Sequence, residues 1–180
     1  SLEAAKIAQS KQRMIDAATR MAEVGGYSIT WHLAFYQGQP KEKVYDSVKK
    51  TVKEVVQTLK DNGHTIWIRP ETTGKATQWG DIDECLKLSS EIDMVMPCVD
   101  FSHMHARTNG KENTYEEFRQ TLTKVENTLG KDGLHNMHIQ ISGIAYGEKG
   151  EKHHLPLKES DLNYRLLMKA IKEFGCKGVI

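Results

Sequence analysis

The sequence predicts one α/β domain over residues 1–180, with parallel strands joined by helices. Helical and strand patterns alternate along the whole chain, and several of the segments end at glycine or at an Asn-Gly pair. Repeated strand-then-helix units make neighbouring strands parallel, because each helix carries the chain back to the start of the sheet. A chain of 180 residues is long enough for one domain with a sizeable core.

The first half of the chain is expected to alternate between helices and strands. Its clearest helix carries apolar residues at helical spacing from Val44 to Leu59 and ends at Asn62 and Gly63. The elements expected here are a helix over 2–24, a strand over 28–33, a helix over 44–59, a strand over 64–69 and a helix over 81–92.

The second half continues this alternation. An apolar run bounded by polar residues predicts a buried strand over 93–99, and Thr114 or Asn113 is the expected N-cap of the next helix. A long loop rich in Gly, Lys and Glu is expected after the following strand. The remaining elements are a helix over 114–129, a strand over 136–142, a helix over 159–174 closed by Gly175, and the beginning of a strand at 178–180.

Composition excludes some classes of function. The 25 basic residues nearly cancel the 24 acidic ones, so binding to nucleic acid would depend on a local patch. No run approaches the roughly 20 apolar residues that cross a bilayer, so a soluble, cytoplasmic protein without membrane contact is expected. Cys85, Cys98 and Cys176 lie far apart without a CxxC spacing, which argues against a disulfide framework and against a thiolate zinc site.

Potential metal ligands recur at the carboxyl ends of the predicted strands. Neutral imidazoles and carboxylates are common protein ligands of divalent ions, and parallel α/β folds place their active sites at this edge. Asp100 and His103 leave the same strand end, so they can serve neighbouring ions. The residues expected to bind metal are His32, Glu71, Asp100, His103, His138, Glu151 and His153.

Several of these residues also have structural explanations. His32 could be a buried histidine bonded to a backbone carbonyl, and Arg69 could pair with Glu71 in a structural ion pair. The segment that contains Glu151 and His153 could be a solvated loop. It is the convergence of the whole set that indicates a metal site.

Four segments, in this order, resemble the endonuclease IV family of apurinic/apyrimidinic endonucleases (family 2), particularly its archaeal-type members. They are RPETTG (69–74), CVDFSH (98–103), MHI (137–139) and EKHH (151–154), and the resemblance runs through nearly the whole chain. The interval from His138 to Glu151 and His153 also matches the family. The resemblance implies a partial TIM barrel with about five parallel strands, which lacks the first strands of the full eight-stranded barrel.

The activity that this resemblance implies is zinc-dependent hydrolysis of the phosphodiester bond 5′ to an abasic site in DNA, a step of base excision repair. Glu71 would act as the bridging metal ligand, and the nucleophile would be a metal-bound hydroxide. The family binds three zinc ions. The ligands implied for them are His32 and Glu71 for one ion, Glu71, Asp100 and His138 for a second, and His103, Glu151 and His153 for the third.

The chain departs from the family pattern at several points. Glu151 replaces the commoner aspartate, and Lys152, which with Arg107 is an expected DNA contact, replaces the usual arginine. The chain resembles a family member truncated at both ends, so two of the three zinc sites would each lack a ligand, and at most the third would be nearly complete. Open barrel edges further predict a homo-oligomer that covers them.

Two other functions remain consistent with these residues. The first is a non-catalytic barrel fragment or oligomerising scaffold that keeps the family residues without their reaction. The second is a metal-dependent sugar isomerase or epimerase, because such enzymes use Glu, Asp and His ligands on a related barrel. That second function leaves Glu151 and His153 without an obvious role.

Overall fold

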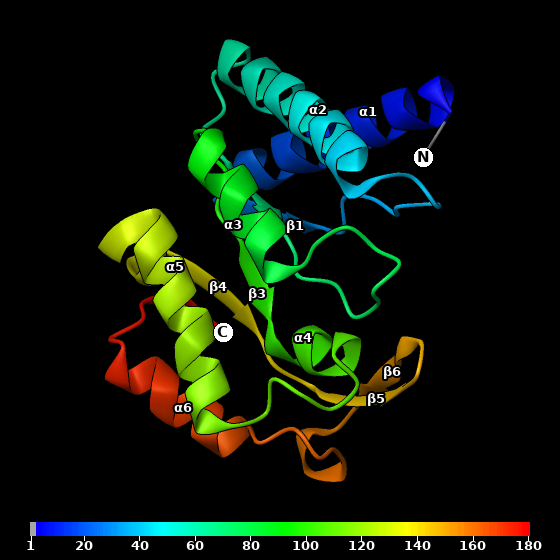
Figure 1. The fold of residues 1–180 in the computed structure, drawn as a ribbon. Coiled ribbons are helices and arrows are strands. Elements are labelled where there is room, and N and C mark those ends of the chain that lie inside the picture. The colour runs from blue at the N-terminus through cyan, green and yellow to red at the C-terminus, as the bar shows by residue number, and fades with distance from the viewer. Residues whose placement is uncertain (1–2) are drawn as a thin grey trace.

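The computed structural model describes residues 3–180 as parallel strands with helices packed against them (Figure 1). The parallel strands are β1 (Ser28–Trp31), β2 (Trp67–Pro70), β3 (Cys98–Asp100), β4 (Met137–Gln140) and β7 (Gly178–Val179). The helices are α1 (Ala4–Glu23), α2 (Lys41–Asp61), α3 (Ile82–Glu91), α4 (Phe101–Arg107), α5 (Tyr115–His135) and α6 (Tyr164–Glu173), with a 3-10 turn over Leu157–Glu159.

The strands follow one another in space in the order in which they occur in the sequence. β1 pairs with β2, β3 with β4, and β4 with β7, all in parallel. Single parallel bridges from Ile68 to Val95 and from Glu71 to Cys98 connect the first pair to the rest. The order β1-β2-β3-β4-β7, with helices between successive strands, is that of a segment of a (β/α) barrel.

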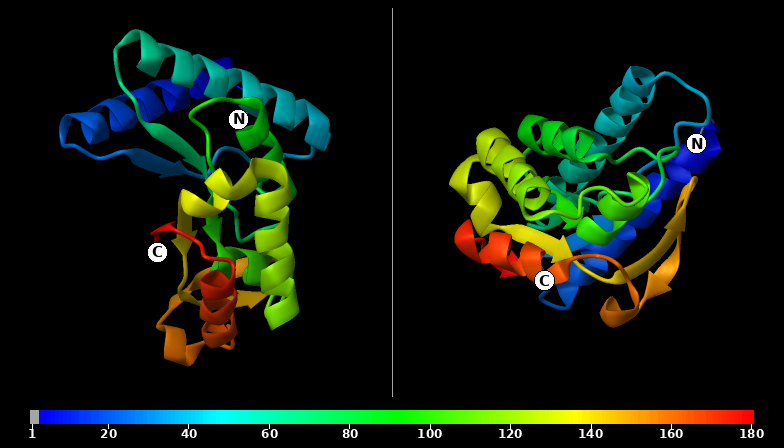
Figure 2. Two further views of the ribbon diagram at one scale, coloured as in Figure 1. Left: turned by 90° about the vertical axis from the view of Figure 1, so that its left-hand side faces the viewer. Right: turned by 60° about the horizontal axis from the view of Figure 1, so that its bottom comes forward.

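Two apolar clusters hold the helices against the strands. α1 and α2 lie side by side at one end of the molecule, and α5 and α6 lie together at the other (Figures 1 and 2). The expected apolar stripe of α2 is confirmed, since Val52, Val55 and Leu59 are almost completely buried in the first cluster. Each such side chain contributes about 1.5–3 kcal/mol through removal from water. Phe118 and Leu122 of α5 occupy the second cluster.

The sequence prediction was wrong about the segment after β4. The expected loop is an antiparallel hairpin, formed by β5 (Gly143–Gly147) and β6 (Gly150–Leu155). Its turn ends at Gly150, whose φ of +88° is a conformation that glycine adopts at little cost. The abundance of glycine and charge that suggested a loop is thus the composition of a short, two-residue hairpin turn and the two strands beside it.

Other boundaries differ for local reasons. Helix α4 was not predicted, because seven residues are too few for a clear helical period. β3 begins only at Cys98, because Met94 adopts a positive φ of 60°, Val95 makes a single bridge to Ile68, and Pro97 has no N–H to donate. Thr114 is the N-cap of α5, as expected, and α6 begins at Tyr164 because a 3-10 turn occupies the expected start. Residue 2, the expected start of the first helix, lies outside the described residues. Within residues 3–180 no helix is long and apolar enough to span a membrane.

Candidate metal centre

A group of imidazoles and carboxylates lies at the carboxyl ends of β1, β2 and β3. His32 follows β1, Glu71 follows β2, and Asp100 ends β3. His103 lies one turn into α4, and Glu151 comes from the hairpin strand β6. Residues that are far apart in the sequence meet here because parallel strands end at the same edge of the sheet.

The first metal-ligating group consists of His32, Glu71 and His103. Nε2 of His32 lies 3.0 Å from Oε1 of Glu71, and Nδ1 of His103 lies 3.2 Å from the same oxygen. The two imidazole rings meet edge to face at 5.3 Å. One ligand atom from each residue can be chosen so that all lie within 4.8 Å of one another, which is close enough for one ion to reach all three after small side-chain adjustments.

Asp100 fixes the position of His103 from the start of α4. Its Oδ1 accepts a hydrogen bond of 2.9 Å from the backbone N–H of His103, and its Oδ2 lies 3.3 Å from His103 Nδ1. Asp100 is therefore the N-cap of α4 and a neighbour of the candidate metal ligands, and it is not itself a member of the first group. The backbone of Asp100 is itself held by Thr72 through two hydrogen bonds.

The second metal-ligating group consists of His103, Glu151 and His154. Nε2 of His103 lies 3.8 Å from Oε2 of Glu151, and Nε2 of His154 lies 3.7 Å from Oε1. Nε2 of His103 faces this second group, while its Nδ1 faces the first group and also lies 3.0 Å from the carbonyl oxygen of Thr72.

His154 takes the place for which the sequence suggested His153. The hairpin register changes between Ala145 and Tyr146, so that Ala145 pairs with His153 but Tyr146 pairs with Glu151. This β-bulge inserts one extra residue, Lys152, and breaks the strict alternation of faces. His153 is exposed and belongs to neither group.

His138 also lies outside both groups, although it comes from the expected strand. Its Nδ1 lies 3.3 Å from the hydroxyl of Thr30 in β1. Gln140, two residues along β4, reaches the centre instead. With its amide oriented to satisfy its neighbours, its nitrogen donates to Glu71 Oε1 at 3.0 Å and to Asp100 Oδ2 at 3.2 Å.

The charges of the centre are mutually stabilised. Burial by itself raises the pKa of Glu71, but hydrogen bonds from His103 and His32 outweigh it and lower that pKa to about 2. Burial likewise lowers the pKa of His103, while Glu71, Asp100 and Glu151 raise it to about 9. Burial raises the pKa of Asp100 above its ordinary value. Such opposing shifts in one buried cluster are typical of functional sites.

Arg69 is not the partner of Glu71, so the structural ion pair suggested by the sequence does not form. The Arg69 side chain is fully buried and donates to the carbonyl oxygens of Pro97 and Asn136 and to the side-chain oxygen of Asn136. Glu71 therefore has imidazoles and an amide as its neighbours. This leaves its carboxylate available to a cation.

The loop between β2 and α3 forms a wall of the centre. Arg107 donates to Thr73, Lys75 and Gln78, so its guanidinium holds this loop against α4. These hydrogen bonds give Arg107 a structural role that does not depend on contact with DNA. Lys152, the other expected DNA contact, is exposed on β6.

The residues present fit divalent metal ions. Each group combines a carboxylate with two imidazoles, the ligand chemistry that zinc and related ions prefer, and no cysteine is among them. Glu71, Asp100 and His103 are buried and His32 and His154 are exposed, so each group has a solvent-facing side.

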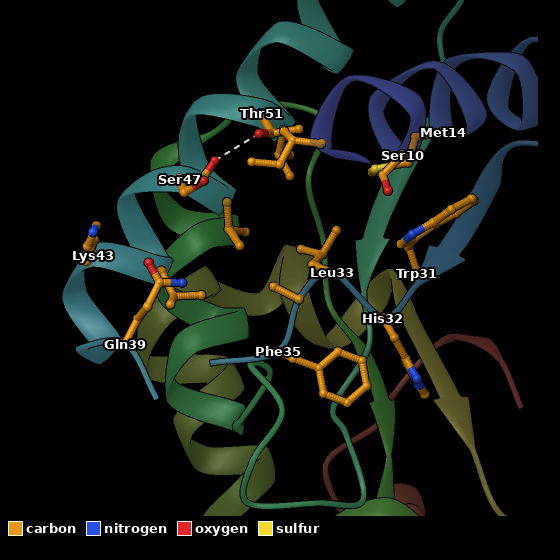
Figure 3. A pocket seen from close by; sticks show the side chains of 15 residues that line it. Ser10, Met14, Trp31, His32, Leu33, Phe35, Gln39, Lys43, Ser47 and Thr51 are labelled. Carbon is orange, nitrogen blue, oxygen red and sulfur yellow. Dashed lines mark hydrogen bonds between the residues drawn. The ribbon is translucent and has the colours of Figure 1, made fainter. Parts of the chain in front are cut away.

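A separate cavity of about 460 Å³ lies between α1, α2 and the segment that follows β1 (Figure 3). Met14, Val44 and Val48 contribute to its apolar part, and Ser10 and Lys43 to its polar part. Of the metal-ligating residues only His32 lines it, and Figure 3 shows that ring pointing away from the apolar part. The cavity is thus adjacent to the centre but does not contain it.

Solved structures that share this fold include sugar epimerases and an endonuclease IV. A D-tagatose 3-epimerase-like protein superposes with a TM-score of 0.76 at 20% identity, covering 100% of this chain and 64% of its own. The D-allulose 3-epimerase from Methylomonas sp., solved with D-allulose, gives 0.69 at 14% identity, covering 100% of this chain and 57% of its own. Endonuclease IV from Thermus thermophilus gives 0.53 at 14% identity, covering 91% and 68%. At these identities the likeness concerns the fold alone.

A sequence relative is also known from Methanocaldococcus jannaschii, the uncharacterized protein MJ0133, which is 43% identical over 175 residues. The match covers 97% of this chain and 63% of that protein, so the chain spans less than two thirds of its relative. The family model described as the xylose isomerase-like TIM barrel matches residues 1–180. The narrower resemblance to endonuclease IV is thereby supported only at the level of this broader family. The chain belongs to the xylose isomerase-like TIM barrel family.

Proposed function

We propose that the chain carries the metal centre of a divalent-metal-dependent endonuclease that hydrolyses the phosphodiester bond 5′ to an abasic site in DNA. The observation that carries this proposal is the pair of ligand groups that share His103. Such an arrangement suits hydrolysis of a phosphodiester by more than one ion. The chain spans less than two thirds of its relative, so the activity of the whole protein is part of the proposal.

The chain's own residues have distinct tasks in this proposal. His32 and Glu71 would hold one ion, and His103, Glu151 and His154 a neighbouring one, since a neutral imidazole offers its lone pair to one ion only. Divalent ions bound there supply positive charge for the phosphate oxygens and acidify water.

Other residues orient the ligands. Asp100 fixes His103, and the Gln140 amide orients Glu71 and Asp100.

Exposed Lys152 lies next to Glu151 and is a candidate contact for the phosphate backbone, to which it would contribute a single point charge.

A second candidate function is metal-dependent epimerisation of a sugar. It is favoured by the solved structures of epimerases, which superpose with higher TM-scores than the endonuclease does. In that case Glu71 would serve a single ion together with His32 and His103. The group formed by Glu151 and His154 would then have no task, and for this reason we prefer the endonuclease.

The test compares both reactions on the same metal-loaded protein. A duplex with one abasic site should be nicked on its 5′ side. Glu71→Gln and Glu151→Gln should each lower the rate by about 100-fold or more, since even changes to the residues that support metal ligands cost 10–100-fold. Glu148→Gln, at the exposed hairpin turn, is the matched control and should leave the rate unchanged.

Two outcomes would contradict the endonuclease. One is conversion of D-tagatose or D-allulose with manganese or cobalt and no nicking, which would establish the epimerase. The other is neither reaction and no metal bound, which would support the non-catalytic scaffold. Nicking that persists in Glu71→Gln at the wild-type rate would identify a contaminating nuclease.

A further inference from the structure

A hydrogen-bonded cluster outside the metal centre joins helix α4 to the β5–β6 hairpin. Its members are His105 of α4, Tyr146 of β5 and Asp161, which lies between the 3-10 turn and α6. His105 is fully buried, although it is a polar residue and has no part in either metal-ligating group.

The bonds in this cluster are short and specific. The hydroxyl of Tyr146 donates to Asp161 Oδ2 at 2.6 Å, and Nε2 of His105 lies 3.0 Å from Asp161 Oδ1. On the other side of the ring, Nδ1 of His105 lies 2.8 Å from the carbonyl oxygen of Lys111. Both ring nitrogens therefore face oxygen atoms of other residues. The rings of His105 and Tyr146 also meet edge to face at 4.9 Å.

The surrounding backbone leaves little freedom to this arrangement. A side-chain carbon at Gly110 would lie 2.7 Å from the Tyr146 hydroxyl oxygen, so glycine is needed there for packing as well as for its φ of +95°. Asn113 donates to the carbonyl oxygen of Asp161 at 2.9 Å. The hydroxyl of Ser160 accepts from the backbone N–H groups of Ile144, at the base of the hairpin, and of Leu162.

The cluster reaches the metal centre from both of its ends. His105 is two residues from His103 on the same short helix, and Tyr146 pairs directly with Glu151 across the hairpin. Asp161 thus connects the element that carries the shared histidine to the element that carries Glu151 and His154.

We propose that His105, Asp161 and Tyr146 are positioning residues that set the separation between His103 and the Glu151–His154 pair. The proposal presumes that the second group binds a metal, as the proposed function has it, but not that the reaction is cleavage of DNA. Burial raises the pKa of Asp161, and bonds from Tyr146 and His105 outweigh it and lower that pKa, in keeping with a carboxylate that accepts two hydrogen bonds.

The test uses Tyr146→Phe, which removes one hydroxyl and keeps the ring. In the metal-free protein, amide hydrogen exchange over residues 143–155 should become faster, because the hairpin loses its bond to Asp161. In titrations with zinc the affinity of the second group should fall about 10- to 100-fold, as is usual when a residue behind a metal ligand is changed, while that of the first group is unchanged. Asp161→Asn should act in the same direction.

The matched control is Tyr45→Phe, since the Tyr45 hydroxyl donates at 2.6 Å to Glu91 at the far end of α3, away from the metal centre. This variant should lower the melting temperature to a similar extent and leave zinc affinity unchanged. In a Glu151→Gln background, Tyr146→Phe should cause no further loss of zinc affinity.

Unchanged exchange in the hairpin, or an equal loss of affinity at both classes of sites, would overturn the positioning role. If wild-type protein binds zinc only at one class of sites, the second group is not a metal site and the proposal fails with it. The nicking assay is separate: protein that shows the expected exchange and zinc response but never nicks refutes the endonuclease and leaves the positioning role standing.

Discussion

At the scale of single residues, Gly74 shows how close the loop after β2 comes to the metal centre. A side-chain carbon at this position would lie 2.5 Å from Oε2 of Glu151, closer than real atoms approach. The backbone N–H of Glu151 donates to the carbonyl oxygen of Gly74 at 2.9 Å, so the two segments cannot simply move apart. Only glycine fits, because the carboxylate occupies the space of a methyl group.

We therefore expect Gly74→Ala to displace the Glu151 carboxylate and to weaken zinc binding at the second group by about 10-fold or more, with the first group retained. Isothermal titration with zinc measures this. Gly147→Ala is the control, because the new methyl group would meet only the flexible end of Lys152. Equal affinities in the two variants would show that Glu151 is not a ligand.

At the scale of elements, two helices begin with complete capping boxes. In α3 the side chain of Asp81 accepts from the N–H of Glu84 and the Glu84 side chain accepts from the N–H of Asp81; Thr114 and Glu117 do the same in α5. Each box satisfies backbone donors that the helix itself cannot. The α3 box helps to fix the end of the loop that borders the metal centre.

Removal of the α5 cap should cost about 1 kcal/mol of unfolding free energy in Thr114→Ala, whereas Thr114→Ser should retain most of it. Urea titration at neutral pH measures the difference. No difference between the two variants would mean that Glu117 alone holds the helix start.

The same cap predicts a dependence of stability on pH. Hydrogen bonds from the Thr114 side chain and from nearby backbone N–H groups lower the pKa of Glu117 from 4.5 to about 2. The folded pKa is the lower one, so the contribution of Glu117 is complete above pH 4.5 and is lost as the pH falls towards about 2. Glu117→Gln should lower stability near neutral pH and flatten its decline over this range; Glu116→Gln is the control. The group is largely solvated, so the effect should not exceed about 1 kcal/mol.

At the scale of the whole molecule, metal and fold should stabilise each other. Both ligand groups draw residues from separate elements, so an ion bound there stabilises the folded chain by mass action. Zinc at about 100 times its dissociation constant would add about 2.7 kcal/mol. This corresponds to roughly 5–10 °C in melting temperature for a domain of this size.

Chelator should reverse the rise in melting temperature, and the double variant Glu71→Gln, Glu151→Gln should show little of it. Calorimetry or circular dichroism with zinc and with chelator measures the shift. An unchanged melting temperature in the wild type would favour the non-catalytic scaffold over any metal enzyme.

Because the sheet has two edge strands, we expect the 180-residue polypeptide to associate with itself. Among the described residues β1 and β7 each have a strand neighbour on one side only, and Val179 and Ile180 are exposed. Unpaired edges with exposed apolar side chains favour pairing with another copy. Sedimentation should show a dimer or larger species that Val179→Lys weakens, and a monomer at all concentrations would contradict the expectation.

Much of the architecture could be predicted from the sequence, because it depends on periodicity that is visible locally. The apolar stripe of α2, the N-cap Thr114 and the succession of parallel strands follow from spacing along the chain. Most of the candidate ligands also followed, since His32, Glu71, Asp100 and His103 stand at the carboxyl ends of strands or just beyond them, and the structure brings them together with Glu151 of the hairpin.

Only the tertiary structure decided which neighbours complete the centre. A bulge in β6 brings His154 and not His153 towards Glu151. On β4 it is Gln140, two residues after His138, whose side chain reaches Glu71. The partner of Arg69 was likewise decided by packing, since Asn136 lies across the sheet from it. The sequence by itself determined the fold class and the chemistry of the candidate ligands, because both depend on residue type and local period. Which atoms meet depends on strand register and on one inserted residue, and these are set by contacts between distant segments.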